Sequence, residues 1–211
     1  SFVGSTGIGH TRWATHGRPT DANAHPHVSY DGKVAIVHNG IIENFAPLRA
    51  ELEDAGVELK SDTDSEVACH LLARAYNGED ESGTAGDFEA SALAVLGRLE
   101  GAFTLLFTHA DHADRIIAAR RSTPLIVGVG GDGMYLGSDV AAFIAHTKEA
   151  VELGQDNVVV ITADDYKIMG FDGVEQSGRP FTIDWDLAAA EKGGFDSFMI
   201  KEIHEQPGAV R

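Results

Sequence analysis

Apolar residues recur at helical spacing in the stretch between residues 44 and 99. Leu48 and Leu52 lie four positions apart, and Val67, Leu71 and Ala75 share one face of a further helix. The pattern predicts three helices. The first covers residues 44–55, the second begins within residues 61–66, and the third covers residues 88–99. Two more helical segments are expected near the C-terminus, at 187–192 and 198–205.

The second predicted helix begins inside a polar segment, residues 61–66. Thr63 and Glu66 have the spacing of a capping box, so Asp64 falls in the first helical turn. A carboxylate at that position stabilises the helix dipole, which is its structural interpretation. Its functional interpretation is a fixed carboxylate that pairs with the ammonium group of a ligand.

Short apolar runs separated by turns replace the helical pattern after residue 100. They predict hairpins in an antiparallel sheet, with strands at 102–108, 115–119, 125–129, 134–137, 158–162 and 166–170. Earlier strands are expected at 7–12 and at 33–38, the latter ended by Asn39-Gly40, and a short helix at 140–145. Because most connections are too short for a crossover helix, we expect an α+β fold with antiparallel pairing.

Composition and charge narrow the classes of function. The chain has 211 residues, of which 43% are hydrophobic and 23% charged, as in ordinary globular proteins. Its formal net charge of −17 argues against nucleic acid and against an anionic membrane surface as partners. One cysteine cannot form an internal disulfide, and a cytoplasmic location is expected. No apolar run approaches the roughly 20 residues of a membrane-spanning helix.

The densest polar stretch, residues 9–17, is predicted to be a loop next to a strand. It carries Arg12, Thr15 and His16. The planar fork of an arginine suits a carboxylate, and the threonine and histidine supply further donors. The alternative is a surface loop with a partly buried Trp13.

Asn39-Gly40 follows a hydrophobic run and has two interpretations. An asparagine amide and a glycine N–H can form an oxyanion hole for acyl transfer. The same dipeptide is also a common turn. If Arg12 held a carboxylate and Asp64 an amine, the two would bind both ends of an α-amino acid, provided that they lie close together.

Histidine and cysteine are the remaining candidates for chemistry. Five histidines occur early in the chain, at positions 10, 16, 25, 27 and 38. They lack the spacing and the cysteine partners of common metal sites, so we expect no metal and no cofactor. A metal-binding protein built on these histidines is the rival interpretation. Cys69 lies in the middle of a predicted helix, where a buried and unreactive thiol is expected.

Several motifs, in this order, resemble the glutaminase domain of the glucosamine-6-phosphate synthase family. They are GHTRWATHG at 9–17, NAHPH at 23–27, VHNGIIEN at 37–44, SDTD at 61–64, ARRSTPL at 119–125, GSDVAAF at 137–143 and KEIHEQP at 201–207. The resemblance covers the whole chain. It implies a glutaminase domain over residues 1–200 and, over 201–211, the start of a linker to an isomerase domain.

The resemblance also implies a fold and an activity. The fold is that of N-terminal-nucleophile hydrolases, with two antiparallel sheets between helical layers. The activity is hydrolysis of the glutamine side-chain amide, which releases ammonia for transfer to fructose-6-phosphate. The implied partners are L-glutamine and the isomerase domain of the same polypeptide, within a homodimer.

Site residues follow from the matching motifs. The resemblance places the glutamine carboxylate on Arg12, Thr15 and His16, and its α-amine on Asp64. It assigns the oxyanion hole to Asn39 and Gly40, the mouth of an ammonia channel to Trp13, and the setting of a mobile glutamine loop to His25.

The nucleophile is where this sequence departs from the family. There it is an N-terminal cysteine whose own α-amine acts as the base. This chain starts with Ser1-Phe2 and enters the family pattern partway. We therefore expect a domain without its first segment, without the nucleophilic cysteine, and without glutamine turnover by these residues alone. Two alternatives stay open: a non-catalytic amino-acid-binding module of the same fold, and another class II amidotransferase.

Overall fold

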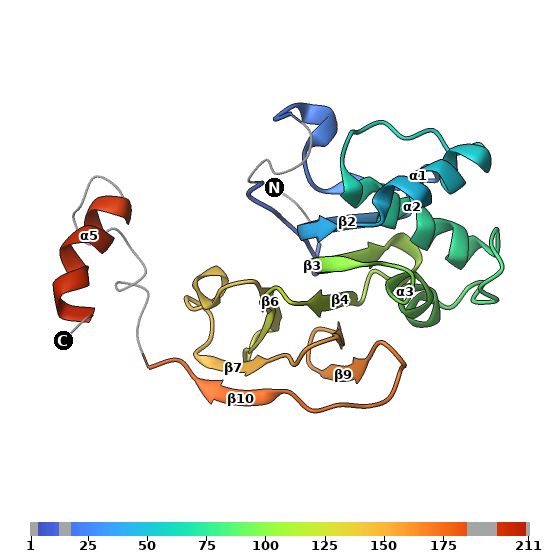
Figure 1. Ribbon diagram of the computed structural model, residues 1–211. Helices are drawn as coiled ribbons and strands as arrows, with labels where there is room; N and C mark the ends of the chain where they lie inside the picture. Colours follow the sequence, from blue (N-terminus) through green and yellow to red (C-terminus); the bar gives the residue numbers. More distant parts are fainter. Residues whose placement is uncertain (1–3, 13–17, 185–197, 210–211) are drawn as a thin grey trace.

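Two antiparallel sheets lie face to face in the computed structural model, which describes residues 4–12, 18–184 and 198–209 (Figure 1). The six-stranded sheet has the order β1-β2-β3-β4-β8-β9, and the four-stranded sheet has the order β10-β7-β5-β6. The strands are β1 (His27–Val28), β2 (Val34–Ile42), β3 (Gly101–His109), β4 (Ile116–Arg121), β5 (Ile126–Val129), β6 (Met134–Gly137), β7 (Glu149–Glu152), β8 (Asn157–Ile161), β9 (Tyr166–Gly170) and β10 (Arg179–Thr182). The helices are α1 (Phe45–Asp54), α2 (Asp64–Asn77), α3 (Phe88–Leu96) and α5 (Phe198–Ala209), with short 3-10 helices η1 (Asp21–Asn23), η2 (Ala110–His112) and η3 (Val140–Ala142).

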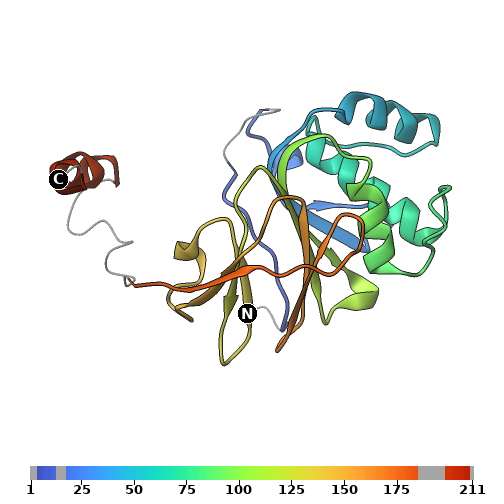
Figure 2. The ribbon, with the colours of Figure 1, turned by 60° about the horizontal axis from the view of Figure 1, so that its bottom comes forward.

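Both faces of the six-stranded sheet are buried. Phe103, Leu105 and Phe107 of β3 pack toward the helices, whereas Leu106, between them, packs toward the second sheet. β4 and β8 alternate in the same way, as strands with two covered faces must. Figure 2 shows α1, α2 and α3 gathered on the side of the molecule away from the four-stranded sheet.

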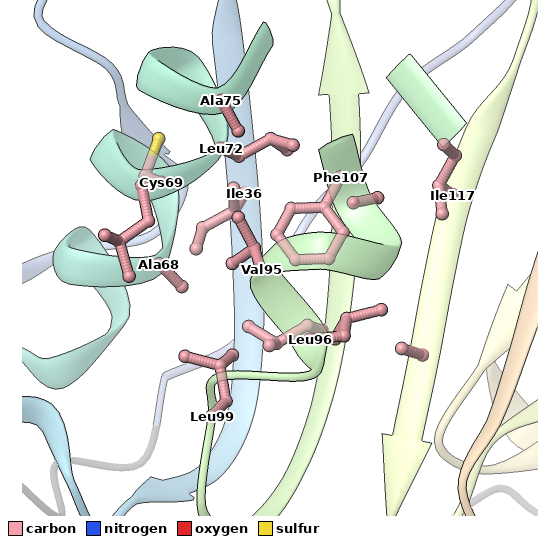
Figure 3. Close-up of a cluster of buried hydrophobic side chains, with 14 of the residues drawn as sticks. Ile36, Ala68, Cys69, Leu72, Ala75, Val95, Leu96, Leu99, Phe107 and Ile117 are labelled. Carbon is pink, nitrogen blue, oxygen red and sulfur yellow. The ribbon is translucent and has the colours of Figure 1, made fainter. Parts of the chain in front are cut away.

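Helix α2 lies against strands β1 and β2 of the six-stranded sheet. Its inner face is rich in small side chains, and Ala68, Ala73 and Ala75 are fully buried. Small residues let the helix backbone approach the strands closely, so Leu72 meets Ile36 and Phe107 in one cluster (Figure 3). This packing fixes the first turn of α2 relative to β2.

Most predicted elements are confirmed. The helices α1, α2 and α3 occur where periodicity placed them, and the predicted strands from residue 102 onward are all present as β3–β6, β8 and β9. Thr63 caps α2 by accepting a hydrogen bond from the backbone N–H of Glu66 at 3.4 Å. The expected hairpin of β8 and β9 is antiparallel.

Several predictions need correction. Residues 7–12 belong to no strand, and β2 does not end at Asn39-Gly40 but runs through it to Ile42. The helix expected at 140–145 is only the 3-10 turn η3. Strands β1, β7 and β10 were not expected, and the predicted helix at 187–192 lies outside the described residues.

Helix α5 begins before the expected domain boundary and continues past it. The helix covers residues 198–209, so the secondary structure marks no break between 200 and 201. The division into a glutaminase domain and a linker stays a prediction. Within the described ranges, no helix is both long and apolar enough to span a membrane.

Strands β2 and β3 approach each other unusually closely at two glycines. Gly40 has φ +125°, and a Cβ placed there would lie 2.1 Å from the carbonyl oxygen of Ala102. Across the ladder Gly101 has φ +116°, and its Cβ would lie 2.3 Å from the carbonyl oxygen of Ile41. Only glycine tolerates both the backbone angle and this distance. The backbone freedom of Gly40, which the sequence suggested would serve a turn, is therefore needed inside a pair of strands.

A Gly40→Ala substitution tests this constraint. We expect it to lower the free energy of unfolding by about 2 kcal/mol or more, since backbone strain adds to a clash with backbone atoms. Gly56→Ala is the matched control, because Gly56 also has positive φ, +81°, but no atom lies within 4 Å of its Cβ position. Denaturant unfolding measures both. Equal losses in the two variants would contradict the close approach.

Candidate functional site

The first turn of α2 is held by a buried carboxylate. Glu66 accepts hydrogen bonds from the backbone N–H groups of Lys60 and Ser61, at 2.8 and 2.7 Å, and from the Ser61 hydroxyl at 2.7 Å. His70 completes the set at 3.2 Å. Burial by itself would raise the pKa of Glu66, but these hydrogen bonds outweigh it and lower that pKa to about 2. The charged carboxylate thus fixes the chain just before Asp64.

Asp64 connects this helical turn to the strand that carries Asn39 and Gly40. Its side chain is buried, and Oδ2 accepts a hydrogen bond from the backbone N–H of Ile42 at 2.7 Å. The same oxygen lies 3.8 Å from Nδ1 of His38. One short hydrogen bond therefore joins the predicted amine-binding carboxylate to the strand that carries the predicted oxyanion pair.

Four of the early histidines form one cluster, in which His38 lies next to Asp64. The rings of His10 and His25 lie 4.5 Å apart between centroids, and those of His25 and His27 lie 4.8 Å apart. His38 reaches the same group from β2 through Ser65, whose Oγ lies 2.8 Å from His38 Nδ1 and 3.1 Å from His25 Nε2. The sequence shows these histidines but does not show that they lie close together in the fold.

Burial keeps these histidines neutral. It lowers the pKa of His25 to about 3, helped by the positive charge of neighbouring groups that include Arg12. Burial likewise lowers the pKa of His38, although nearby Asp64 acts in the opposite direction. The pKa values of His10 and His27 are lowered by burial as well. Within the described residues, no group of three or more His, Cys, Asp or Glu is placed to hold a metal ion.

Arg12 lies near this histidine group. Its positive charge contributes to lowering the pKa of His10, His25 and His27. Its guanidinium donates to the carbonyl oxygen of Arg18 at 3.1 Å. The predicted carboxylate-binding and amine-binding residues thus both lie near one histidine cluster.

The loop beyond Arg12 is tied to the start of α2. The Asn23 amide donates to the same Arg18 carbonyl at 3.0 Å and to Asp62 Oδ2 at 3.3 Å. The backbone N–H of Asp62 donates back to Asn23 Oδ1 at 2.9 Å. Of the other predicted binding residues, Trp13, Thr15 and His16 lie outside the described residues.

Asn39 lines a cavity of about 330 Å³ between the two sheets. His10, Thr104, Leu106 and Ser138 line it as well. His10 lies against the Asn39 side chain, and this contact raises the pKa of the imidazole, whereas burial, the larger effect, lowers it.

Cys69 lies apart from this site. Its sulfur is fully buried on α2 and is directed at the carbonyl oxygens of His27 and Val34, at 3.5 and 3.6 Å. Burial raises the pKa of the thiol well above its usual value. The expectation of a buried cysteine is confirmed, and such a thiol cannot serve as a nucleophile.

Comparison with known proteins decides the family. A family model described as a glutamine amidotransferase domain matches residues 10–145. This chain belongs to the glutamine amidotransferase domain family. Every described residue of the site discussed above falls within the matched range.

Close relatives of this amidotransferase domain are much longer proteins. The glutamine–fructose-6-phosphate aminotransferase (isomerizing) of Mycobacterium tuberculosis H37Rv is 68% identical over 100% of this chain, which spans 34% of that protein. The enzyme of the same name from Corynebacterium glutamicum is 62% identical, over 97% of the chain and 32% of its own length. The chain thus spans about a third of these relatives.

Solved structures confirm the fold class. The glutamine phosphoribosylpyrophosphate amidotransferase of B. subtilis, solved with ADP and GMP, matches with a TM-score of 0.62 at 25% identity, over 77% of this chain and 34% of that one. The allosteric regulatory enzyme of purine biosynthesis matches with a TM-score of 0.58 at 24% identity, over 71% of this chain and 31% of that one. The stacked antiparallel sheets of the amidotransferase domain are those of an N-terminal-nucleophile hydrolase.

Sequence analysis missed Ser65, the supporting role of Glu66, and the contact of His10 with Asn39. Ser65 stands beside a recognised residue, and a serine in a first helical turn is ordinary. Its contacts come from segments about 27 and 40 residues away in sequence, which periodicity does not reveal. The five early histidines were the available signal, and only the fold shows that four of them meet.

The buried histidines predict a pH dependence of stability. Because the pKa of His25 is about 3 when folded and 6.5 otherwise, the unfolded chain binds a proton between these values and the folded chain does not. The free energy of unfolding should therefore fall as the pH drops below about 6.5. In the His25→Asn variant, unfolding near pH 5 should take up about one proton fewer than unfolding of the wild-type protein. Denaturant unfolding between pH 5 and 7 measures this slope, and identical slopes in both proteins would refute it.

Proposed function

We propose that this domain binds L-glutamine and hydrolyses its side-chain amide, releasing ammonia. Arg12 binds the α-carboxylate, and Asp64 binds the α-ammonium group. The observation that carries the proposal is the hydrogen bond from the Ile42 N–H to Asp64, because it places an amine-binding carboxylate beside the strand with Asn39 and Gly40. Thr15 and His16 are proposed as further donors to the carboxylate, on the resemblance alone.

Distances along β2 suit the substrate. Gly40 and Ile42 are two residues apart, which corresponds to roughly 7 Å in an extended strand. From its α-nitrogen to its side-chain amide oxygen, glutamine has five bonds of about 1.2 to 1.5 Å each and extends to roughly 6 Å, which is a similar span. A glutamine whose amine is at Asp64 can therefore present its amide carbon to Asn39 and Gly40.

Asn39 and Gly40 are proposed as the oxyanion hole. Attack on the amide carbon moves negative charge onto the amide oxygen, and two fixed donors stabilise that charge. Asn39 lines the cavity between the two sheets and contacts His10, and Gly40 follows it directly on β2. A nucleophilic N-terminal cysteine, implied by the resemblance, stays a prediction, since Cys69 does not qualify.

We further propose fructose-6-phosphate as the acceptor of the ammonia. The support is the name shared by relatives 62–68% identical to this chain. Transfer requires an isomerase domain in the same polypeptide, for which residues 201–211 are proposed as the linker. The ammonia channel at Trp13, the loop-setting role of His25, the homodimer and the cytoplasmic location stay predictions from the resemblance.

A rival function is binding of an amino acid without hydrolysis. Both functions need Arg12 and Asp64, but only hydrolysis needs the Asn39–Gly40 pair. Asn39→Ala in the full-length protein should therefore lower kcat for ammonia release about 100- to 1,000-fold while KM for glutamine changes little. The control is Ile41→Ala, on the same strand and 49% exposed.

Ammonia release and amino-sugar formation are measured on the same samples. An Asn39→Ala protein with wild-type turnover would contradict the oxyanion role. Wild-type protein that binds glutamine without releasing ammonia would establish the rival function, and ammonia release without amino-sugar formation would indicate a different acceptor.

A further inference from the structure

Ser65 carries a hydroxyl that three side chains of the candidate glutamine site share. It is 2% exposed, in the first turn of α2, and it contacts residues from three segments of the chain. Its Oγ lies 2.8 Å from Nδ1 of His38 on β2 and 3.1 Å from Nε2 of His25 in the preceding loop. The third neighbour is Oδ1 of Asp64, at the longer distance of 3.5 Å.

The unpaired ring nitrogens determine which way these hydrogen bonds run. Nδ1 of His25 and Nε2 of His38 are buried and have no hydrogen-bond partner among the residues that the structure describes. A buried N–H without a partner is costlier than a bare acceptor, so the unpaired nitrogens are the unprotonated ones. His25 then carries its proton on Nε2 and His38 on Nδ1, and both donate to Ser65.

Every hydrogen-bonding position of the Ser65 hydroxyl is then occupied. A serine oxygen accepts two hydrogen bonds and donates one. The two histidines fill both acceptor positions, which directs the hydroxyl proton toward the remaining neighbour, Oδ1 of Asp64. The other oxygen of Asp64 already accepts from the Ile42 N–H. Both carboxylate oxygens are then oriented.

We propose that Ser65 is a positioning residue for glutamine recognition, which accepts from His25 and His38 and donates to Asp64. This inference rests on the proposed function. Ser65 touches no substrate itself, but it holds the carboxylate that binds the substrate amine and fixes the tautomers of both rings around it. Ser65 thus joins the loop of His25, strand β2 and helix α2 at the amine-binding end of the site.

Kinetics of the full-length protein test the role. Ser65→Ala should raise KM for glutamine about tenfold while kcat changes by less than about threefold, because the charge-assisted contact that orients Asp64 is lost. Ser65→Thr keeps the hydroxyl and should restore KM to within about threefold. The matched control is Ser91→Ala, since Ser91 is fully buried and bonded only to Thr84 on the far side of the helical layer. Unchanged KM in Ser65→Ala would overturn the proposal.

Nitrogen-15 NMR of labelled histidines tests the network without relying on a variant that must fold. In the wild-type protein, His25 should be protonated at Nε2 and His38 at Nδ1. The opposite tautomer at either ring would overturn the assignment of donors. If the wild-type protein failed to release ammonia, the proposed function would fail, while the tautomers would still decide whether Ser65 joins the two rings.

Discussion

The hydrogen bond between the Ile42 N–H and the Asp64 carboxylate is the contact on which the site depends. It fastens the N-terminal turn of α2 to the strand that carries Asn39 and Gly40. Glu66 secures the same turn from the other side by binding the backbone of Lys60 and Ser61. Since α2 is also packed closely on the sheet through its alanines, the turn has little freedom to move. The proposed amine-binding residue and the proposed oxyanion pair are therefore held at one rigid junction.

This junction contains few charged groups, although the formal net charge of the whole chain is −17. Four histidines form a cluster beside Asp64, and burial holds their pKa values down, so the cluster stays neutral at ordinary pH. Asp64 and Arg12 are then the charged groups that the proposed amino-acid substrate would meet. A low-dielectric surrounding strengthens both contacts compared with water. The net charge of the chain says little about this site.

The sequence predicts much of the fold, and the exceptions have physical causes. Helices with strong apolar periodicity and Thr63 at the α2 cap were found because their signals are local. Strand β10 contains Arg179-Pro180, a composition that sequence analysis takes for a loop but that an edge strand tolerates. Asn39-Gly40 reads as a turn, yet the close pairing of Gly40 with β3 overrides that signal. At the site, Arg12 and Asp64 were identified from residue type and resemblance, whereas the histidine cluster and Ser65 depend on tertiary contacts that no local pattern carries.

The most direct test is a crystal structure of the full-length protein with L-glutamate, the product of glutamine hydrolysis, bound. The account predicts the α-ammonium group within hydrogen-bond distance of Asp64 and the α-carboxylate on the Arg12 guanidinium. One oxygen of the side-chain carboxylate should face the Asn39 amide and the Gly40 N–H. A glutamate whose amine binds away from Asp64, or whose side chain points away from β2, would contradict it.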